Sequence, residues 1–272
     1  MTKSQGVQDA AEQLLGWLKE TDRKLDLQSP VSLNNDKLNG QQQQLNIIEK
    51  DIESHKPSVD SVKSAVLDLR SCDIDMARAM EGKVNDINTK FVAAQRKCRG
   101  AIRETNDVSD KLTKFNDRLD GLKSWVQTTT DSLESSDWNK RPVDQQKLRV
   151  EDAKIEKQRQ LQAMESLQSL GHDLVEDPRT GDPAAVKMAL ANLEQAWLKF
   201  DDCLGERDSE ADLKESKEHE YEAIKREVVR WLTHMEGDVD AFNSVAVDMD
   251  VVARQIEELQ VKIIMFTCLL SD

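Results

Sequence analysis

The sequence predicts an all-α protein made of tandem three-helix bundles, and three observations support this fold class. Glycine and proline are scarce, at 10 and 5 of 272 residues, whereas charged residues make up 33% and aromatic residues only 4%. Apolar residues recur at steps of three and four, the spacing that places them on one face of a helix. The same apolar pattern returns further along the chain, which indicates a repeated structural unit.

Aromatic residues mark the period of this repeat. Trp17, Trp125 and Trp231 stand in similar contexts at intervals of 108 and 106 residues. Phe91 and Trp197 are a second pair of markers, also 106 residues apart. At this offset apolar residues also coincide in the pairs Met80 with Val186, Val84 with Leu190, Ile87 with Leu193, Ala94 with Phe200 and Cys98 with Leu204. We therefore expect the tryptophans to pack inside the bundles, although exposed anchors for a partner are an alternative.

The first repeat is expected to cover residues 1–107. The apolar stripe of its first helix is Val7, Ala11, Leu14, Leu18 and Leu25. Pro30 then prevents the helix from continuing, and neighbouring serines and asparagines can cap the next one. The second helix, over residues 36–69, has the stripe Leu38, Leu45, Ile48, Ile52, Val59, Val62 and Val66. Pro57 should kink it, because proline removes one backbone donor, and a turn is expected at residues 71–73.

The third helix of this repeat is predicted to continue into the first helix of the next. Between Met80 and Leu133 the stepping by three and four does not break, and no proline occurs between Pro57 and Pro142. A flexible linker would be rich in glycine, serine or proline. We therefore expect one helix over residues 75–133, about 90 Å long at 1.5 Å per residue.

The second repeat is expected to cover residues 108–215 and to follow the same plan. Its loop LESSDWNKRPVD precedes a helix over residues 143–175. The segment EDPRTGDP then forms a turn, and the next helix begins near Pro183, because proline is favoured in the first helical turn.

A partial third repeat is expected over residues 216–272. The junction before this repeat is more polar, and its heptad pattern shifts by about one residue. We therefore expect a less stable helix there. We expect a first helix over residues 221–239, then a loop over residues 240–247, and then part of a second helix up to residue 270. The apolar positions of these two helices include Ile224, Val228, Leu232, Met235, Val252, Ile256, Leu259, Ile263, Met265 and Phe266.

The composition disfavours several classes of function. A net charge of −14 at pH 7 opposes binding to nucleic acids and to anionic membranes. The first residues lack the apolar region of a signal peptide, and no run of about 18 apolar residues could span a membrane. The cysteines are far apart without a CxxC spacing, which fits reduced thiols in the cytosol. They are Cys72, Cys98, Cys203 and Cys268.

No catalytic, cofactor-binding or metal-binding set follows from the spacing of residues, so we expect no enzyme and no cofactor. The histidines, which show no HExxH or paired spacing, are His55, His172, His219 and His234. The cysteines are expected to be small buried hydrophobes, with metal ligation or redox sensing as the lesser alternative. The glycines that stand singly in the helical pattern, and form no phosphate-binding loop, are Gly82, Gly100 and Gly121.

Two polar clusters could contact partners, although each has a simpler interpretation. Gln41 begins a run of four glutamines, for which a polar helix face is favoured over a low-complexity binding tract. The one basic concentration consists of Lys90, Arg96, Lys97, Arg99 and Arg103. It could dock an acidic surface of actin or a microtubule, but a solvated face paired with nearby acids is the favoured interpretation.

The chain resembles the spectrin repeat at its marker positions: a period of 106 residues, a tryptophan in each first helix and an aromatic residue in each third helix. The markers are Trp17, Trp125, Trp231, Phe91 and Trp197. The loops LQSPVSLNNDKL and FNSVAVDMDVV are most similar to those of spectraplakins, the dystonin and microtubule–actin cross-linking group. Nesprins, dystrophins and spectrins are alternatives.

The resemblance implies a cytoplasmic, cytoskeletal rod that acts as an elastic spacer and a protein-docking surface. Such rods link actin-binding and microtubule-binding ends, and neither a calponin-homology-like stretch nor a calcium-binding loop motif occurs here. An alternative follows from spectrin β-chains, in which a partial repeat of two helices captures a partner's helix. By that analogy residues 216–272 would self-associate or accept a helix from another protein.

Overall fold

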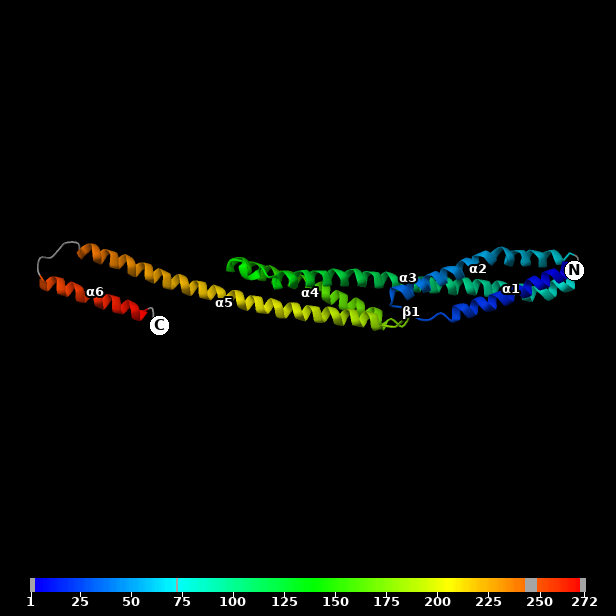
Figure 1. The fold of residues 1–272 in the computed structure, drawn as a ribbon. Helices are drawn as coiled ribbons and strands as arrows, with labels where there is room; N and C mark the ends of the chain where they lie inside the picture. The colour runs from blue at the N-terminus through cyan, green and yellow to red at the C-terminus, as the bar shows by residue number, and fades with distance from the viewer. Residues whose placement is uncertain (1–2, 72, 243–248, 270–272) are drawn as a thin grey trace. The chain divides into compact units, whose positions relative to one another are not determined.

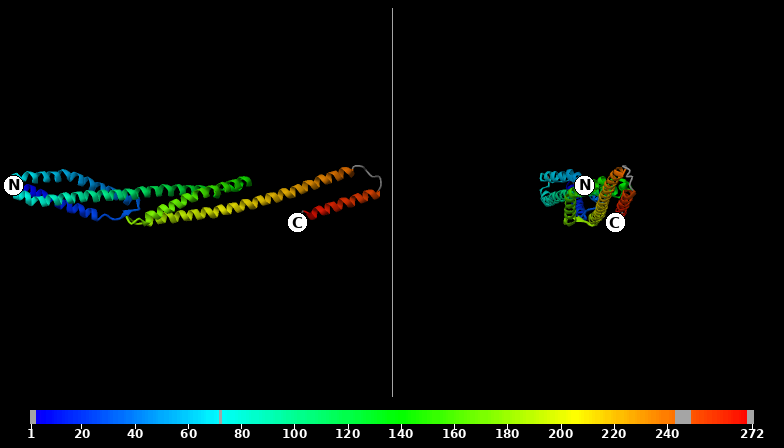
Figure 2. Two further views of the ribbon diagram at one scale, coloured as in Figure 1. Left: turned by 180° about the vertical axis from the view of Figure 1, so that it is seen from behind. Right: turned by 90° about the vertical axis from the view of Figure 1, so that its left-hand side faces the viewer.

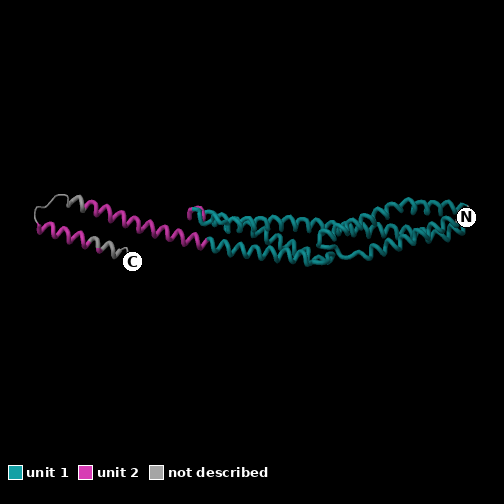
Figure 3. The backbone as a smooth tube through the Cα atoms, in the orientation of Figure 1, with its two compact units in different colours: residues 1–141, 148–207 teal, residues 142–147, 208–272 magenta. Residues whose placement is uncertain are grey.

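The computed structural model describes the backbone of residues 3–71, 73–242 and 249–269 (Figure 1). Its elements are α1 Lys3–Asp26, β1 Val31–Ser32, α2 Asn35–Leu69, α3 Ile74–Glu134, the 3₁₀ helix η1 Trp138–Lys140, α4 Val143–Glu176, β2 Thr180–Gly181, α5 Ala184–Phe242 and α6 Met249–Leu269. The all-α prediction is confirmed, since the two described strands have only two residues each. The chain divides into a first unit, residues 1–141 with 148–207, and a second unit, residues 142–147 with 208–272 (Figure 3).

The first bundle consists of α1, α2 and the first half of α3, which lie side by side in Figures 1 and 2. The stripes predicted for α1 and α2 are buried in its core. The core residues are Val7, Ala11, Leu14, Leu18, Leu25, Leu45, Ile48, Ile52, Val59, Val62, Val66, Leu69, Ala77, Met80, Ile87, Phe91, Ala94 and Cys98. One residue of the predicted α2 stripe, Leu38, belongs instead to the core of the second bundle.

The ends of these helices follow local capping chemistry. The side chain of Asn34 accepts hydrogen bonds from the backbone N–H groups of Asp36 and Lys37 at the start of α2. Asp73 does the same for Met76 at the start of α3. Both caps satisfy backbone donors that have no partner within the helix. The helix α2 continues through Pro57.

The second bundle of the first unit consists of the second half of α3, α4 from Leu148 onward and α5 as far as Arg207. Its core residues from these helices and η1 are Val108, Leu112, Phe115, Leu119, Leu122, Val126, Leu133, Trp138, Val150, Ala153, Met164, Leu167, Leu174, Val186, Leu193, Trp197, Phe200, Cys203 and Leu204. Trp138, in the loop after α3, is 1% exposed, so the loop itself closes one end of this core.

The shared helix predicted over residues 75–133 is confirmed as α3, which runs without a break from Ile74 to Glu134. Thr105 and Val108, which stand where the two repeats meet, are both buried. The stripe shifts by one residue near the end of the helix, where Thr130 is more buried than the predicted Thr129. Every core of the first unit therefore takes one side from α3.

The first-helix and third-helix markers of each repeat meet in space. The ring of Trp17 lies 6.4 Å from that of Phe91. The ring of Trp125 lies 5.5 Å from that of Trp197 and 5.1 Å from that of Phe200. Trp17 and Trp125 are only partly buried, while both pack against core residues. The prediction that the tryptophans pack inside the bundles is thus confirmed for Trp17 and Trp125, although both remain partly exposed.

The second unit contains the later part of α5 and the helix α6. The helix expected across the second junction is present, since α5 continues to Phe242. It therefore extends into the predicted loop of residues 240–247, the rest of which lies outside the described residues. The slipped stripe is largely exposed, at 49% for Ile224 and 47% for Leu232. The side chains of Ile263, Met265 and Phe266 lie outside the described part of the chain.

We expect Thr105→Pro to destabilise the first unit by about 3 kcal/mol or more, because proline inside a helix removes a backbone hydrogen bond and clashes with the preceding turn. Thr105 lies in the middle of α3, and its Oγ1 also donates to the carbonyl of Ala101 at 2.8 Å. Urea denaturation followed by circular dichroism measures the loss.

Ile74→Pro is the matched control, because Ile74 is the first residue of α3 and the preceding Asp73, with φ −152° and ψ 83°, is not helical. Proline is tolerated at that position, so we expect a cost below about 1 kcal/mol. Equal effects of the two substitutions would contradict the role of α3 as one continuous helix.

We expect Trp125→Ala to cost about 3 kcal/mol, at the low end for truncating a large core side chain. The value is low because Trp125 is only partly buried, while its contacts with Trp197 and Phe200 are lost. Thermal and urea denaturation of the variant give the change in unfolding free energy. A loss below about 1 kcal/mol would contradict a packing role, since surface substitutions have effects of this size.

Candidate functional site at the junction of the two bundles

The loop between α1 and α2, residues 27–34, contributes side chains to the core of the neighbouring bundle. Val31 and Leu33 are buried, and both belong with Leu38 to the second bundle's core cluster. The sequence pattern predicted only a helix break here. The loop thus packs against the second half of α3 as well as joining two helices of the first bundle.

The same loop forms a short parallel ladder with the turn between α4 and α5. Val31 pairs with Thr180 and Ser32 with Gly181, and the N–H of Val31 donates to the carbonyl of Arg179 at 2.9 Å. A Cβ atom added at Gly181 would lie 3.1 Å from the Cβ of Pro30, so a side chain there would press on the loop. The turn EDPRTGDP therefore docks against the first repeat.

Gln41 holds the loop in this extended conformation. Its Oε1 accepts from the N–H of Ser32 at 2.8 Å, and its Nε2 donates to the carbonyls of Pro30 at 2.9 Å and Ser29 at 3.3 Å. The next residue, Gln42, donates to the side chain of Asn106 on α3 at 3.0 Å. The glutamine run, interpreted from sequence as a polar helix face, supplies four hydrogen bonds at the junction through two of its residues.

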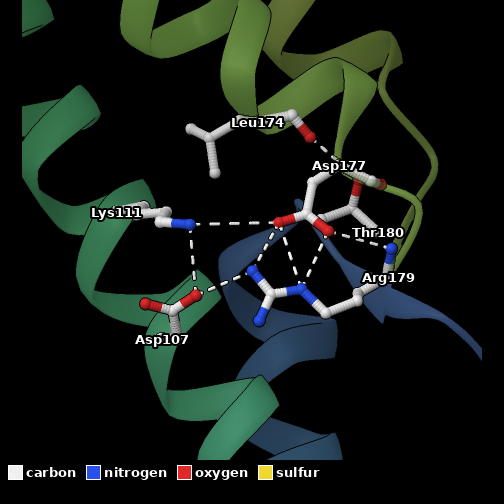
Figure 4. A network of polar contacts seen from close by, with 6 residues as sticks. All are labelled: Asp107, Lys111, Leu174, Asp177, Arg179 and Thr180. Carbon is white, nitrogen blue, oxygen red and sulfur yellow. Dashed lines mark hydrogen bonds and ion pairs between the residues drawn. The ribbon is translucent and has the colours of Figure 1, made fainter.

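A charge network joins α3 to the turn before α5, and we call Asp107, Lys111, Asp177 and Arg179 the junction network (Figure 4). Arg179 donates to both oxygens of Asp177, from Nε at 2.9 Å and from Nη2 at 2.6 Å. Its Nη2 also donates to Asp107 at 2.7 Å. Lys111 lies 3.1 Å from Asp107 and 3.9 Å from Asp177.

A hydroxyl contact and a further ion pair complete the junction. The Oγ1 of Thr180 donates to the carbonyl of Leu174 at 2.8 Å and to that of Asp177 at 2.9 Å, which ties the turn to the end of α4. Lys37, near the start of α2, pairs with Asp182 at 3.1 Å. Asp182 has a φ of 58°, a left-handed conformation that aspartate adopts more readily than most residues.

The electrostatics of the junction network favour its ionised form. Hydrogen bonds from Arg179 lower the pKa of Asp177 to about 2, although partial burial opposes the shift. The hydrogen bond from Arg179 likewise lowers the pKa of Asp107, with a smaller contribution from Lys111. A lowered carboxyl pKa adds stability above its unfolded value, near 3.9 for aspartate, and this is lost as the pH falls through about 2. The carboxyl group of Asp177 is therefore ionised above about pH 4.

A surface cavity of about 330 Å³ lies beside the network. It is lined by Leu25, Gln28, Ser29, Pro30, Val31, Gln41, Leu45, Ala101, Glu104, Thr105, Pro178 and Arg179. Its walls thus come from α1, the loop 27–34, α2, α3 and the turn after α4. The cavity carries both charge signs, through Glu104 and Arg179.

The histidines and cysteines considered from sequence are not brought together in the described part of the chain. His55 stacks on Trp17 with ring centroids 3.8 Å apart, while Trp17 donates to Asp51 at 2.9 Å. His172 is exposed and lies 3.4 Å from Glu176. Among the described residues, no group of three or more histidine, cysteine or acidic side chains is placed to hold a metal ion.

Cys98 and Cys203 are free thiols buried in the two cores, as expected for small hydrophobes. Burial raises the pKa of both thiols, which disfavours the reactive thiolate form. Cys72 lies outside the described residues, and Cys268 belongs to α6, with its side chain outside the described part of the chain. None of the described helices has an apolar stretch that could cross a membrane.

The basic cluster is largely paired with acids of its own bundle. Lys90 lies 2.8 Å from Asp86, and Lys97 contacts Asp22 at 2.8 Å and Asp26 at 2.5 Å. Arg99 lies 3.8 Å from Glu49. Three of the five basic residues are therefore ion-paired, as the interpretation of a solvated face paired with nearby acids predicts.

Comparison with known proteins supplies the remaining information. No family model matches the chain. Over 260 residues, or 93% of its length, the chain is 22% identical to microtubule-actin cross-linking factor 1 of Rattus norvegicus, and it covers 5% of that protein. It is also 22% identical to isoforms 1/2/3/4 and 6/7 of microtubule-actin cross-linking factor 1 of Mus musculus, of which it covers 4% and 8%.

The chain thus spans less than a tenth of the length of the curated relatives it matches. Those relatives are named as cytoskeletal cross-linkers, which fits a structural rather than an enzymatic class. The resemblance expected from sequence is confirmed: along nearly its whole length the chain is similar to a spectraplakin, and its helices are consistent with a rod of spectrin repeats.

Proposed function

We propose that this chain is an elastic spacer in a cytoskeletal cross-linker, in which neighbouring repeats are coupled mechanically through their junction. The observation that carries the proposal is the combination of the unbroken helix α3 with the loop 27–34, whose Val31 and Leu33 are buried in the next bundle's core. Two bundles that share a helix, one of which inserts side chains into the core of the other, resist bending more than bundles joined by a flexible linker.

The contacts of the junction support this role because each opposes rotation of one bundle against the other. Bending at Thr105 would separate β1 from β2 and break the hydrogen bond between Val31 and Arg179. It would also lengthen the ion pairs between Arg179 and Asp107 and between Lys37 and Asp182. Nearest-neighbour coupling of this kind spreads a load over adjacent repeats.

The names of the relatives give the proposal its cellular context. They describe cross-linking of microtubules and actin, so a cytoskeletal location is proposed for this chain as well. By the spectraplakin resemblance, actin and microtubule binding would belong to end domains and not to these repeats. Its own partners are then other proteins that dock on the sides of the rod, and the proposed repeat boundaries are residues 1–107, 108–215 and 216–272.

A second candidate function, an assembly module, is favoured by the apolar surface of the second unit. On the later part of α5 and on α6 many large apolar side chains are exposed: Leu213, Tyr221, Ile224, Val229, Leu232, Met249, Val251, Val252, Ile256, Val261 and Ile264. Apolar surface of this extent on a folded protein usually marks an interaction site. An amphipathic helix, from another copy or another protein, would cover it in the manner of a third bundle helix.

We expect Arg179→Ala to lower the unfolding free energy of the first unit by about 1–2 kcal/mol, since charge-assisted hydrogen bonds to two carboxylates are lost. In single-molecule stretching, the fraction of events in which both bundles unfold together should fall. That fraction measures coupling separately from stability.

Arg159→Ala is the matched control, because Arg159 is exposed and pairs with Glu156 of its own helix at 3.1 Å. We expect a change below about 0.5 kcal/mol and unaltered coupling. If wild-type bundles unfold independently, the spacer proposal fails in its coupled form.

For the assembly module we expect the amides of α6 to exchange with solvent much faster than those of α3 in a dilute monomeric sample, because apolar side chains of α6 such as Ile256 and Val261 are exposed. Protection should rise with protein concentration, and Ile256→Gln should reduce that rise. Met188→Gln, at another exposed apolar residue outside the second unit, should leave it unchanged. Strong protection of α6 in a strictly monomeric sample would contradict this second candidate.

A further inference from the structure

Ser29 and Pro30 form a dipeptide that is unusual in this sequence. Pro30 follows a serine, whereas the other four prolines follow Lys56, Arg141, Asp177 and Asp182. Ser29 is therefore the one serine or threonine of the chain that precedes a proline. A kinase active site requires an accessible, extended substrate segment, and Ser29 is exposed in a stretch that is neither helix nor strand.

The position of Ser29 connects it directly to the junction. Its carbonyl accepts a hydrogen bond from Gln41, and two residues later Val31 begins the ladder with β2. Ser29 also lines the cavity of about 330 Å³ whose walls include Glu104 and Arg179. A group attached to the Ser29 hydroxyl would therefore act on the contacts that hold the two bundles together.

We propose that Ser29 is a phosphorylation site for a proline-directed serine kinase, and that the phosphate loosens the junction. This inference rests on the proposed function, since it assigns a regulator to the same junction. In the reaction the Ser29 Oγ attacks the γ-phosphorus of Mg·ATP. A new Oγ–P bond forms, the bond to the β-phosphate oxygen breaks, ADP leaves, and the hydroxyl proton passes to a base of the kinase.

The direction of the effect follows from the charges that surround the site. A phosphoserine carries a charge of about −1.5 to −2 at pH 7. Glu104, in the same cavity wall, repels it, while Arg179 attracts it. Arg179 already binds Asp107 and Asp177, so the phosphate competes with these carboxylates for one guanidinium. Drawing Arg179 away from Asp107 weakens the link between α3 and the turn that carries β2.

The first arm of the test is chemical. The full chain is incubated with Mg·ATP in two parallel reactions, one with a cyclin-dependent kinase and one with a mitogen-activated protein kinase. Mass spectrometry then locates the phosphorylated residues. We expect close to one phosphate per chain at Ser29, with loss of labelling in both Ser29→Ala and Pro30→Ala. Ser71, an exposed turn serine that no proline follows, should remain unlabelled. Failure of both kinases to label Ser29 would overturn the assignment.

The second arm measures the junction and does not depend on a kinase. Phosphoserine is installed at position 29 by genetic-code expansion, with the same residue at position 71 as the matched control. The Val31 amide donates to the backbone carbonyl of Arg179. We expect this amide to exchange about tenfold faster when phosphoserine is at position 29, and not when it is at position 71. A tenfold change corresponds to the loss of one charge-assisted hydrogen bond in the junction. Glu104→Gln in the phosphorylated protein should restore part of the protection.

The two proposals fail in different ways. Uncoupled unfolding of the unmodified wild-type bundles would remove the spacer proposal, whatever happens at Ser29. Coupled unfolding of the wild type, together with unchanged or slower exchange of Val31 after phosphorylation, would overturn only the regulation inferred here.

Discussion

The unbroken apolar stripe of α3 is the constraint on which the first unit depends. Both cores take one side from this helix, so its phase must suit two sets of partners at once. A single inserted residue would rotate the second half by about 100° relative to the first and expose one stripe. The junction contacts follow from this continuity, because α3 brings Asp107 and Lys111 to the point where the loop 27–34 meets the turn before α5.

Apolar burial and ion pairing contribute to the junction on different scales. Burying a valine or leucine side chain contributes about 1.5–3 kcal/mol, and Val31, Leu33 and Leu38 are all buried in the second core. Partly exposed ion pairs contribute roughly 0–1 kcal/mol each. The loop's side chains therefore supply most of the attraction. The junction network sets the alignment, since the bidentate contact with Asp177 in its own turn holds the guanidinium of Arg179 where it reaches Asp107 on α3.

Much of this architecture could be predicted from sequence because its signals are periodic. Stepping by three and four predicted α3 to within one residue at each end, and the offset of 106 residues identified the marker residues Trp125 and Trp197, which the structure brings into contact. The junction could not be predicted in the same way. Val31, Leu33, Gln41 and Arg179 belong to no repeat pattern, and their contacts join segments that lie far apart in the chain. The acidic residues that flank Arg179 in EDPRTGDP are a usable signal of ion pairing, but only once the partner loop is known.

The pairing of β1 with β2 also has a consequence for how the protein is made. Val31 and Thr180 are separated by 149 residues, so on a ribosome adding roughly 5–20 residues per second the loop 27–34 emerges about 7–30 seconds before its partner. The first bundle can fold within that interval, since its contacts are more local. Val31 and Leu33 then remain exposed to water until α4 has been synthesised. A chaperone that binds short apolar segments would find its target there, and release would coincide with completion of the second bundle.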